Sequence, residues 1–322
     1  MFGELRMENN TKFTEFILIG FPGLPQKFHP LVSVTMFLIY IIAMTANGTV
    51  IFLIIVKEHL HQPMYLMIFN LSLSDLIFDT ITLPKIIAMY WFGDGKMSFM
   101  ACIVQTFCVH FLANLNSFTI MLMAVDRYVA IWNPLRYSSI ITNTLIACLC
   151  CILWLIAACF PMSPLLKAAQ VLYCGNKVKS CFCSISSVLP LSCVDTFFIT
   201  ELAFTIAMIT LLIPLAFIIF SYIAIIRTVC LSGRNGDWQK AFYTCSIHLF
   251  VICMYFIPRL FVYTCNQLRL ILNADINVLL LCLYTFVPHV ANPIIYCLRN
   301  KEIKTTIEKI FCLNKNMGHL KI

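Results

Sequence analysis

An acid–base pair, Asp126 and Arg127, stands at the end of a long apolar run and is followed directly by Tyr128. A charged side chain costs about 2.5–3.5 kcal/mol at the centre of a membrane helix, so this pair is expected near a helix end. Cys102 precedes Arg127 by 25 residues. That separation is about 38 Å of helix, enough to cross a hydrocarbon core about 30 Å thick. The spacing predicts one helix with a cysteine at one membrane face and a charged switch at the other.

Further polar side chains interrupt other apolar runs. Asn47 lies in the first run, Asp75 and Asp79 lie in the second, and Asn292 lies near the end of the last. A carboxylate inside a membrane is a functional hypothesis by default, because its burial is costly. Asp75, Asn47 and Asn292 are expected to share one polar network, which either takes part in switching or only fixes helix packing.

A polar stripe precedes the acid–base pair on the same run. Its members recur at steps of four, three and four, which places them on one helix face: His110, Asn114, Ser117 and Met121. The stripe either lines a ligand pocket in the half of the helix nearer Cys102 or forms hydrogen bonds between helices.

Arg259 is a charged residue in the sixth apolar run. It follows Lys240 by 19 residues, which is about 28 Å of helix and places it near the membrane boundary opposite Lys240. Arg259 either pairs with an anionic ligand group, since arginine binds carboxylates through two parallel bonds, or extends to headgroups or the long neighbouring loop.

The composition indicates a membrane protein. The chain has 322 residues, of which 61% are hydrophobic and 11% charged, which is too apolar for a soluble domain. Backbone groups in lipid must be satisfied internally, so the long runs are predicted to be helices. The net charge of +8 is spread between the runs and is concentrated only at the C-terminus. That pattern suits binding to anionic membrane lipid and gives no reason to expect nucleic acid.

Seven helices are expected, at residues 30–56, 63–91, 99–132, 140–165, 196–229, 240–265 and 270–298. A cysteine-rich loop of about thirty residues would join the fourth and fifth helices, and a short basic loop, 231–240, the fifth and sixth. The fold class is an all-α membrane protein, a seven-transmembrane helix bundle. A short amphipathic eighth helix on the inner leaflet is expected from the spacing of isoleucines in residues 300–311.

Three segments follow from this division: an extracellular segment 1–27, a membrane domain 28–298 and a cytoplasmic helix and tail 299–322. The first segment lacks the pattern of a signal peptide. It contains the glycosylation sequon Asn9-Asn10-Thr11. The expected location is the plasma membrane, with the N-terminus outside and the C-terminus inside.

The 17 cysteines are of two kinds. Most lie inside apolar runs as small buried side chains. The others lie at expected helix ends or in the long loop: Cys102, Cys174, Cys181, Cys183 and Cys193. None of them has the paired spacing of a zinc site, so neither a metal nor another cofactor is expected.

Several motifs closely resemble those of odorant receptors, a branch of the rhodopsin-like G-protein-coupled receptors. The resemblance extends from about residue 13 to 300 and rests on 121–137 (MLMAVDRYVAIWNPLRY), 61–65 (HQPMY), 72–76 (SLSDL), 240–249 (KAFYTCSIHL) and 292–296 (NPIIY). It implies a receptor that binds small volatile or water-soluble organic molecules in a transmembrane pocket. The receptor would activate a heterotrimeric, stimulatory olfactory-type G protein and raise cyclic AMP.

The resemblance also assigns roles to residues. Asp126 would hold Arg127 in the resting state, and the remaining switch residues would be Tyr128, Tyr222, His248, Asn292, Pro293 and Tyr296. The pocket would be lined by His110, Ala113, Asn114, Ile206, Thr210, Arg259 and Tyr263. Cys102 would pair with Cys183, and Cys174 with Cys193, leaving Cys181 free.

The chain departs from the family pattern at several positions. Val125 and Trp132 replace a usual Tyr and Cys, and Phe256 stands where a Tyr is frequent. Asn116 stands where a Glu is common, which removes one carboxylate from the network around Asp75. The spacing from Cys174 to Cys183 is one residue short, so Cys181 stays open as the partner of Cys102.

Other classes of protein fit less well. The runs show no internal repeat of the kind found in transporters. No HExxH or GxSxG sequence indicates an enzyme. A non-olfactory receptor of the same fold, for a lipid or a peptide, is the main alternative.

Overall fold

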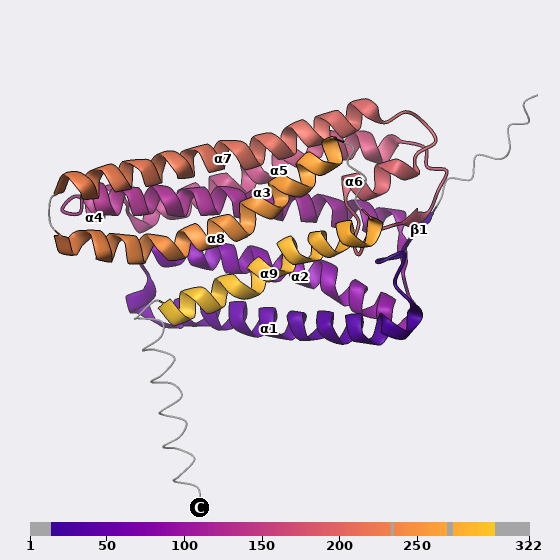
Figure 1. Cartoon of the computed structure of the whole chain (residues 1–322), viewed down its shortest axis with the longest axis horizontal. Coiled ribbons are helices and arrows are strands. Elements are labelled where there is room, and N and C mark those ends of the chain that lie inside the picture. Colours follow the sequence, from indigo (N-terminus) through magenta and orange to yellow (C-terminus); the bar gives the residue numbers. More distant parts are fainter. Residues whose placement is uncertain (1–13, 233–234, 269–272, 300–322) are drawn as a thin grey trace, which may run out of the picture.

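The computed structural model describes residues 14–232, 235–268 and 273–299. Figure 1 shows them as a bundle of long helices that run roughly along one axis. The helices are α1 (His29–Val56), α2 (Pro63–Phe92), α3 (Phe99–Trp132), α5 (Asn143–Gln170), α7 (Phe197–Ser232), α8 (Asn235–Gln267) and α9 (Ala274–Arg299). Short helical turns join them: η1 (Gln26–Phe28), η2 (Glu58–Leu60), α4 (Tyr137–Ile140), α6 (Ile185–Val188) and η3 (Leu189–Leu191). The prediction of an all-α bundle of seven long helices is confirmed.

Local sequence sets several of the helix starts. Pro63 occupies the first turn of α2, where the missing N–H of proline costs no hydrogen bond. Ser98 caps α3 by accepting a hydrogen bond from Ala101 N at 3.2 Å. Thr142 caps α5 in the same way through Leu145 N, so this helix begins at Asn143 instead of the expected residue 140.

Several other helix boundaries also differ from the prediction. The basic loop expected at 231–240 is mostly helical, because α7 continues to Ser232 and α8 begins at Asn235. Hydropathy indicates where a helix leaves the membrane. The backbone hydrogen bonds of the helix can continue into water, so the helix can end later than its apolar run. Helix α5 also continues past Pro161 and Pro164 to Gln170, since packing against neighbouring helices tolerates proline in membrane helices.

A small three-stranded sheet lies at one end of the bundle, which we call the sheet end. Its strands are β2 (Lys96–Ser98), β1 (Glu15–Leu18) and β3 (Lys177–Val178), in that order. Strand β1 is antiparallel to β2 and parallel to β3. Phe16 of β1 is fully buried and packs edge-on against Tyr173, with ring centroids 5.3 Å apart. These strands could not be predicted from the sequence, because strands of two to four residues are too short to show an alternating pattern.

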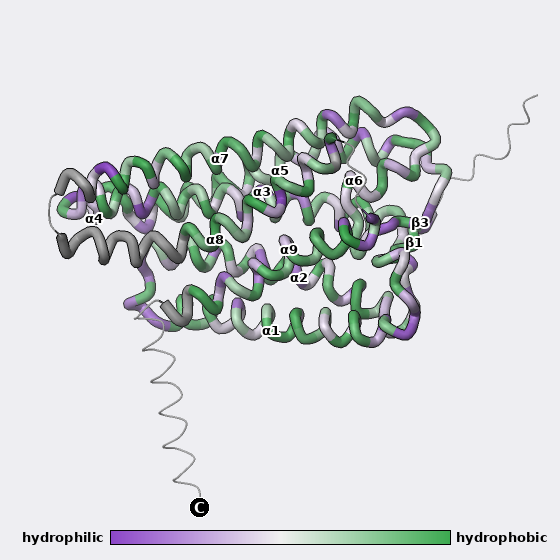
Figure 2. Tube along the Cα trace, in the orientation of Figure 1, coloured by the Kyte–Doolittle hydropathy of each residue, from purple (hydrophilic) through white to green (hydrophobic). Residues whose placement is uncertain are grey.

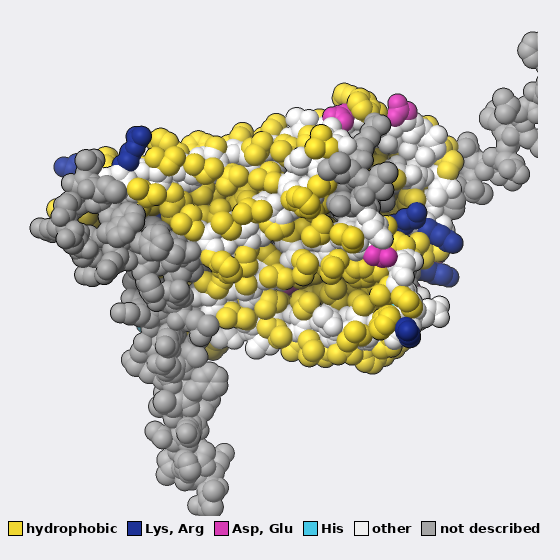
Figure 3. Space-filling view, viewed as in Figure 1, with side chains coloured by type: hydrophobic (Ala, Val, Ile, Leu, Met, Phe, Trp, Pro, Cys, Tyr) yellow, Lys and Arg dark blue, Asp and Glu magenta, His cyan; other side chains and the backbone are white. Residues whose placement is uncertain are grey.

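The outer surface of the bundle is apolar between its two ends. Figure 2 shows hydrophobic residues along the middle of the helices, and in Figure 3 hydrophobic side chains cover much of the visible side. Lys and Arg side chains gather near the two ends in that view. Large side chains such as Leu31, Phe37 and Phe220 are 64%, 47% and 66% exposed. Six described helices are long and apolar enough to span a membrane, and α8 adds a shorter apolar stretch, Leu249–Cys265. The chain is a multi-pass membrane protein.

Helix α3 lies at the centre of the bundle and packs against α2, α5, α7 and α8. One buried cluster joins the sheet end of α3 to α2, α9 and the loop after α5. Another joins its opposite half to α7 and α8. Asn9 and the expected eighth helix lie outside the residues that the structure describes.

Candidate functional site

Two adjacent cavities lie between α3, α7 and α8, towards the sheet end. The deeper one has a volume of about 40 Å³ and the outer one about 160 Å³. Both are lined by His110, Ala113, Arg259 and Tyr263, and the deeper cavity adds Asn114, Ile206 and Thr210. The structure therefore brings the seven candidate pocket residues together around one cavity, although they come from three helices.

The polar stripe on α3 both lines a cavity and forms hydrogen bonds to other elements. His110, Asn114 and Ser117 line the deeper cavity. Ser117 Oγ also donates to Thr210 O of α7 at 2.7 Å, which is a hydrogen bond between helices. His110 Nε2 accepts from Ile185 N at 3.3 Å and so contacts the loop that covers the cavities. Met121 lies farther from the sheet end, against the α7–α8 cluster.

Arg259 is buried in the wall of both cavities. Its side chain is 4% exposed, and Nη1 donates to Tyr255 O at 3.1 Å. The guanidinium lies 3.8 Å from the centroid of the Tyr255 ring and 5.1 Å from that of Tyr284. Of the side chains that the structure describes, no carboxylate lies within 4.0 Å of it. Aromatic faces attract a cation, but they do not neutralise it as a carboxylate would.

The loop between α5 and α7 covers the outer cavity. Cys183 of this loop is disulfide-bonded to Cys102 of α3, with a Cα–Cα distance of 5.5 Å. Cys174 is bonded to Cys193 within the loop. Phe182, Ser184 and Ile185 line the outer cavity from above. Cys181, the alternative partner of Cys102, is a buried free thiol whose Sγ lies 3.8 Å from Cys282 Sγ of α9.

Gln105 ties this loop to the helices beneath it. Its side chain is 3% exposed. Oε1 accepts from Cys183 N at 2.8 Å, and Nε2 donates to Ile81 O of α2 at 3.0 Å. One amide thus connects α2, α3 and the loop. Gln105 could not be singled out from the sequence, because a single glutamine in an apolar run gives no sign of its partners.

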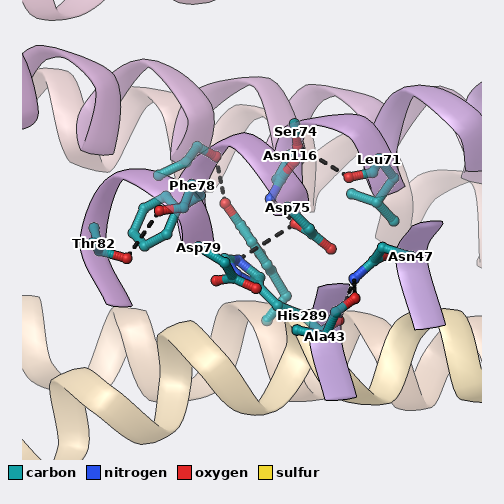
Figure 4. A network of polar contacts seen from close by, with 12 residues as sticks. Ala43, Asn47, Leu71, Ser74, Asp75, Phe78, Asp79, Thr82, Asn116 and His289 are labelled. Carbon is teal, nitrogen blue, oxygen red and sulfur yellow. Dashed lines mark hydrogen bonds and ion pairs between the residues drawn. The ribbon is translucent and has the colours of Figure 1, made fainter. Parts of the chain in front are cut away.

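The polar network forms in the middle of the bundle (Figure 4). Asn116 Nδ2 of α3 donates to Asp75 Oδ1 at 2.7 Å, while Ser74 Oγ contacts Asn116 Oδ1. Asn47 Nδ2 of α1 donates to His289 O of α9 at 2.9 Å. Asn292 is 3% exposed, and its Oδ1 has no partner within the described part of the chain. The network therefore joins α1, α2, α3 and α9.

His289 is the member of this network that the sequence analysis missed. Nδ1 lies 2.7 Å from Asp79 Oδ1, and Nε2 lies 3.4 Å from Asp75 Oδ1. Asp79 is thus an interior partner of His289 and does not line either cavity. A signal was present in the sequence, because His289 precedes Asn292 by three residues and shares its helix face.

The acid–base pair at the far end of α3 has other partners than expected. Tyr137 Oη of α4 donates to Asp126 Oδ1 at 2.7 Å. Arg127 Nη2 contacts Met64 Sδ of α2. No ion pair joins Asp126 to Arg127 among the described contacts, so the expected resting-state pairing is not present here. Adjacent residues point to different sides of a helix, so each side chain meets a different neighbour.

Of the other residues expected to take part in switching, Tyr128 lies on α3 itself and the rest lie on α7, α8 and α9. Tyr128 and Tyr222 belong to the cluster that joins α3, α7 and α8. Asn292 and Pro293 are buried in α9. His248 and Tyr296 lie within α8 and α9, and their side chains are outside the described part of the structure.

A seven-helix bundle with a covered cavity at one end and the sequence Asp126-Arg127-Tyr128 at the other is the arrangement of a G-protein-coupled receptor. A family model described as "Olfactory receptor" matches residues 36–314. Olfactory receptor 1 of Rattus norvegicus is 34% identical over 95% of this chain and 97% of its own length. Olfactory receptor 56A5 of Homo sapiens is 35% identical over 92% of this chain and 95% of its own. The chain belongs to the olfactory receptor family, whose members are plasma-membrane receptors and not enzymes.

Proposed function

We propose that this receptor binds a small organic odorant with an acidic group, held in the two cavities with that group beside Arg259. The observation that carries the proposal is a guanidinium 4% exposed in the wall of both cavities. A buried charge without an opposite partner is costly, and a carboxylate would supply two parallel charge-assisted bonds. Arg259 is buried inside the bundle against Tyr255 and Tyr284, which favours this role over the structural alternative.

The size and lining of the outer cavity suggest a short ligand. An engineered apolar cavity of about 150 Å³ takes up benzene, and the outer cavity here is about 160 Å³. Its walls include Val109, Phe204 and Leu281, while Thr200 and Gln267 provide polar groups. A carboxylic acid with a short apolar chain satisfies both kinds of surface.

The test replaces Arg259 and measures cyclic AMP in cells that also express an olfactory-type G protein. Arg259→Leu should weaken the response to short carboxylic acids about 10- to 100-fold, the worth of a charged hydrogen bond. Responses to the matching methyl esters should change little. Lys167→Leu is the matched control, because Lys167 is an exposed cation at the end of α5 that lines neither cavity. Unchanged potency for the acids, at normal surface expression, would refute the proposal.

We further propose that the sheet end faces outward and that the Arg127 end meets a stimulatory olfactory-type G protein in the cytoplasm. Two disulfides at the sheet end suit an oxidising outer face. Arg127→Ala should abolish the cyclic AMP response without changing surface level. An epitope tag at the N-terminus should be accessible to antibody on intact cells, and an epitope tag at the C-terminus only after permeabilisation. The reverse result would overturn the orientation.

A further inference from the structure

The buried polar network contains an unusual arrangement, one imidazole between two carboxylates. His289 of α9 is 2% exposed, and Asp75 and Asp79 of α2 are 0% exposed. Both ring nitrogens face a carboxylate oxygen, at 2.7 Å for Asp79 and 3.4 Å for Asp75. Figure 4 shows the ring of His289 beside both acids, one helical turn apart on α2. No membrane protein can leave two such carboxylates uncompensated without a large cost in free energy.

The hydrogen bonds around Asp75 indicate where the compensating proton lies. Asp75 Oδ1 already accepts a hydrogen bond from Asn116 Nδ2 at 2.7 Å, so this oxygen acts as an acceptor. A hydrogen on the His289 nitrogen that faces it, 3.4 Å away, would avoid placing two acceptors against each other. The other nitrogen makes a 2.7 Å contact with Asp79, within the range of charge-assisted bonds. A histidine donates from both nitrogens only when it is the imidazolium cation.

The same site has oxygen atoms to spare. Asp75 Oδ2, Asp79 Oδ2, Asn47 Oδ1 and Asn292 Oδ1 are buried and have no hydrogen-bond partner in the described residues. Carboxylate and amide oxygens are the ligands that hard cations prefer. The imidazolium thus occupies a place whose surroundings would otherwise suit a mobile monovalent cation.

We propose that His289 is the built-in counter-cation of this receptor, a permanently protonated side chain that bridges Asp75 and Asp79, offsets one of their two negative charges and so replaces a dissociable ion. The bridge fastens α9 to α2 regardless of the salt outside the cell. It also touches the ligand site, because the His289 ring packs edge-on against Phe78, with ring centroids 5.1 Å apart. Phe78 lines the outer cavity, so His289 is a positioning residue between the cavity and the α2–α9 contact.

The test uses the purified full-length receptor in lipid nanodiscs and needs neither an agonist nor a G protein. Thermal unfolding is followed by tryptophan fluorescence in sodium chloride and in choline chloride at equal ionic strength. The wild-type midpoint should be the same in both salts. His289→Gln, which keeps a polar side chain but removes the charge, should unfold at a lower temperature in choline chloride and recover part of the loss in sodium chloride. A cation at about ten times its dissociation constant shifts the folding equilibrium about tenfold.

Two further variants separate charge from packing. His289→Gln combined with Asp79→Asn removes the cation together with one anion, so it should be more stable than His289→Gln alone in choline chloride. His61→Gln, at an exposed histidine, is the control and should match the wild type. Sodium stabilisation of the wild type would overturn the proposal, and so would a His289→Gln variant that matches the wild type in both salts. If His289→Gln does not reach the cell surface, rescue of surface level by Asp79→Asn supports the proposal, and failure of rescue overturns it.

Discussion

The two hydrogen bonds of the Gln105 side chain allow a quantitative prediction about the loop that covers the cavities. Gln105→Leu keeps most of the buried volume but removes both hydrogen bonds of the amide, to Cys183 N and to Ile81 O. Cys183 N would lose its partner, which costs about 1–3 kcal/mol for a buried backbone group. Ile81 O lies inside α2, where the helix supplies another partner, so the loss of its bond to Gln105 adds only about 0.5–1.5 kcal/mol. The variant should therefore lose about 2–4 kcal/mol of stability, provided that the Cys102–Cys183 disulfide keeps the loop near its place and water does not fill the gap.

Thermal unfolding of the purified receptor measures this loss. A loss of this size should lower the midpoint by about 5 °C or more, given about 2–4 °C per kcal/mol in larger proteins. Gln170→Leu is the matched control, because Gln170 is exposed at the last residue of α5. It should leave the midpoint unchanged. A Gln105→Leu midpoint within about 1 °C of the wild type would show that the amide bonds add no net stability.

Two other hydrogen bonds give further predictions. Trp154 Nε1 donates to Asn70 Oδ1 at 2.6 Å, so Trp154→Phe should lose about 1–2 kcal/mol from the bond and its packing, measured as a lower unfolding midpoint; an unchanged midpoint would contradict this. Tyr137→Phe removes the donor to Asp126 and should raise agonist-independent cyclic AMP, since the freed carboxylate no longer holds α4; a basal signal equal to the wild type would contradict that role. Burial raises the pKa of Tyr137, so the folded state favours the protonated hydroxyl. The contribution of this hydroxyl to stability is complete below about pH 10, the pKa of tyrosine in an unfolded chain. It is lost only as the pH rises above that value.

The helices could be predicted from the sequence because each must satisfy its backbone within the membrane. The bounds of α3 agree with the prediction at both ends, since Ser98 lies at one membrane face and Asp126 and Arg127 lie near the other. The residues that line the deeper cavity could be named in advance because they match the family pattern, and His110 and Asn114 also share a helical spacing. Their common cavity follows once α3, α7 and α8 pack together.

What the sequence could not supply are pairings between distant residues. His289 and Asp79 are 210 positions apart, and neither residue alone indicates the other. The same holds for Gln105 and Cys183, which are separated by 78 positions. Tyr137 displaced Arg127 as the partner of Asp126 because α4 folds back against α3, and a four-residue helix leaves no periodic pattern in the sequence.

The small sheet has a consequence for how helices can be gained or lost in this architecture. Strands β1, β2 and β3 share one sheet, and Gly23 N near β1 donates to Asp275 Oδ1 at the start of α9. The chain must therefore lie at the same face of the membrane at four points, which requires three returns. Two long helices separate each successive pair of these points: α1 and α2, then α3 and α5, then α7 and α8. A return to the same face requires an even number of crossings, so single helices cannot be added or deleted between these points without breaking the sheet. Helix α9 makes the number of described helices odd, so β1 and the last described residues of α9 lie at opposite faces whichever way the bundle inserts.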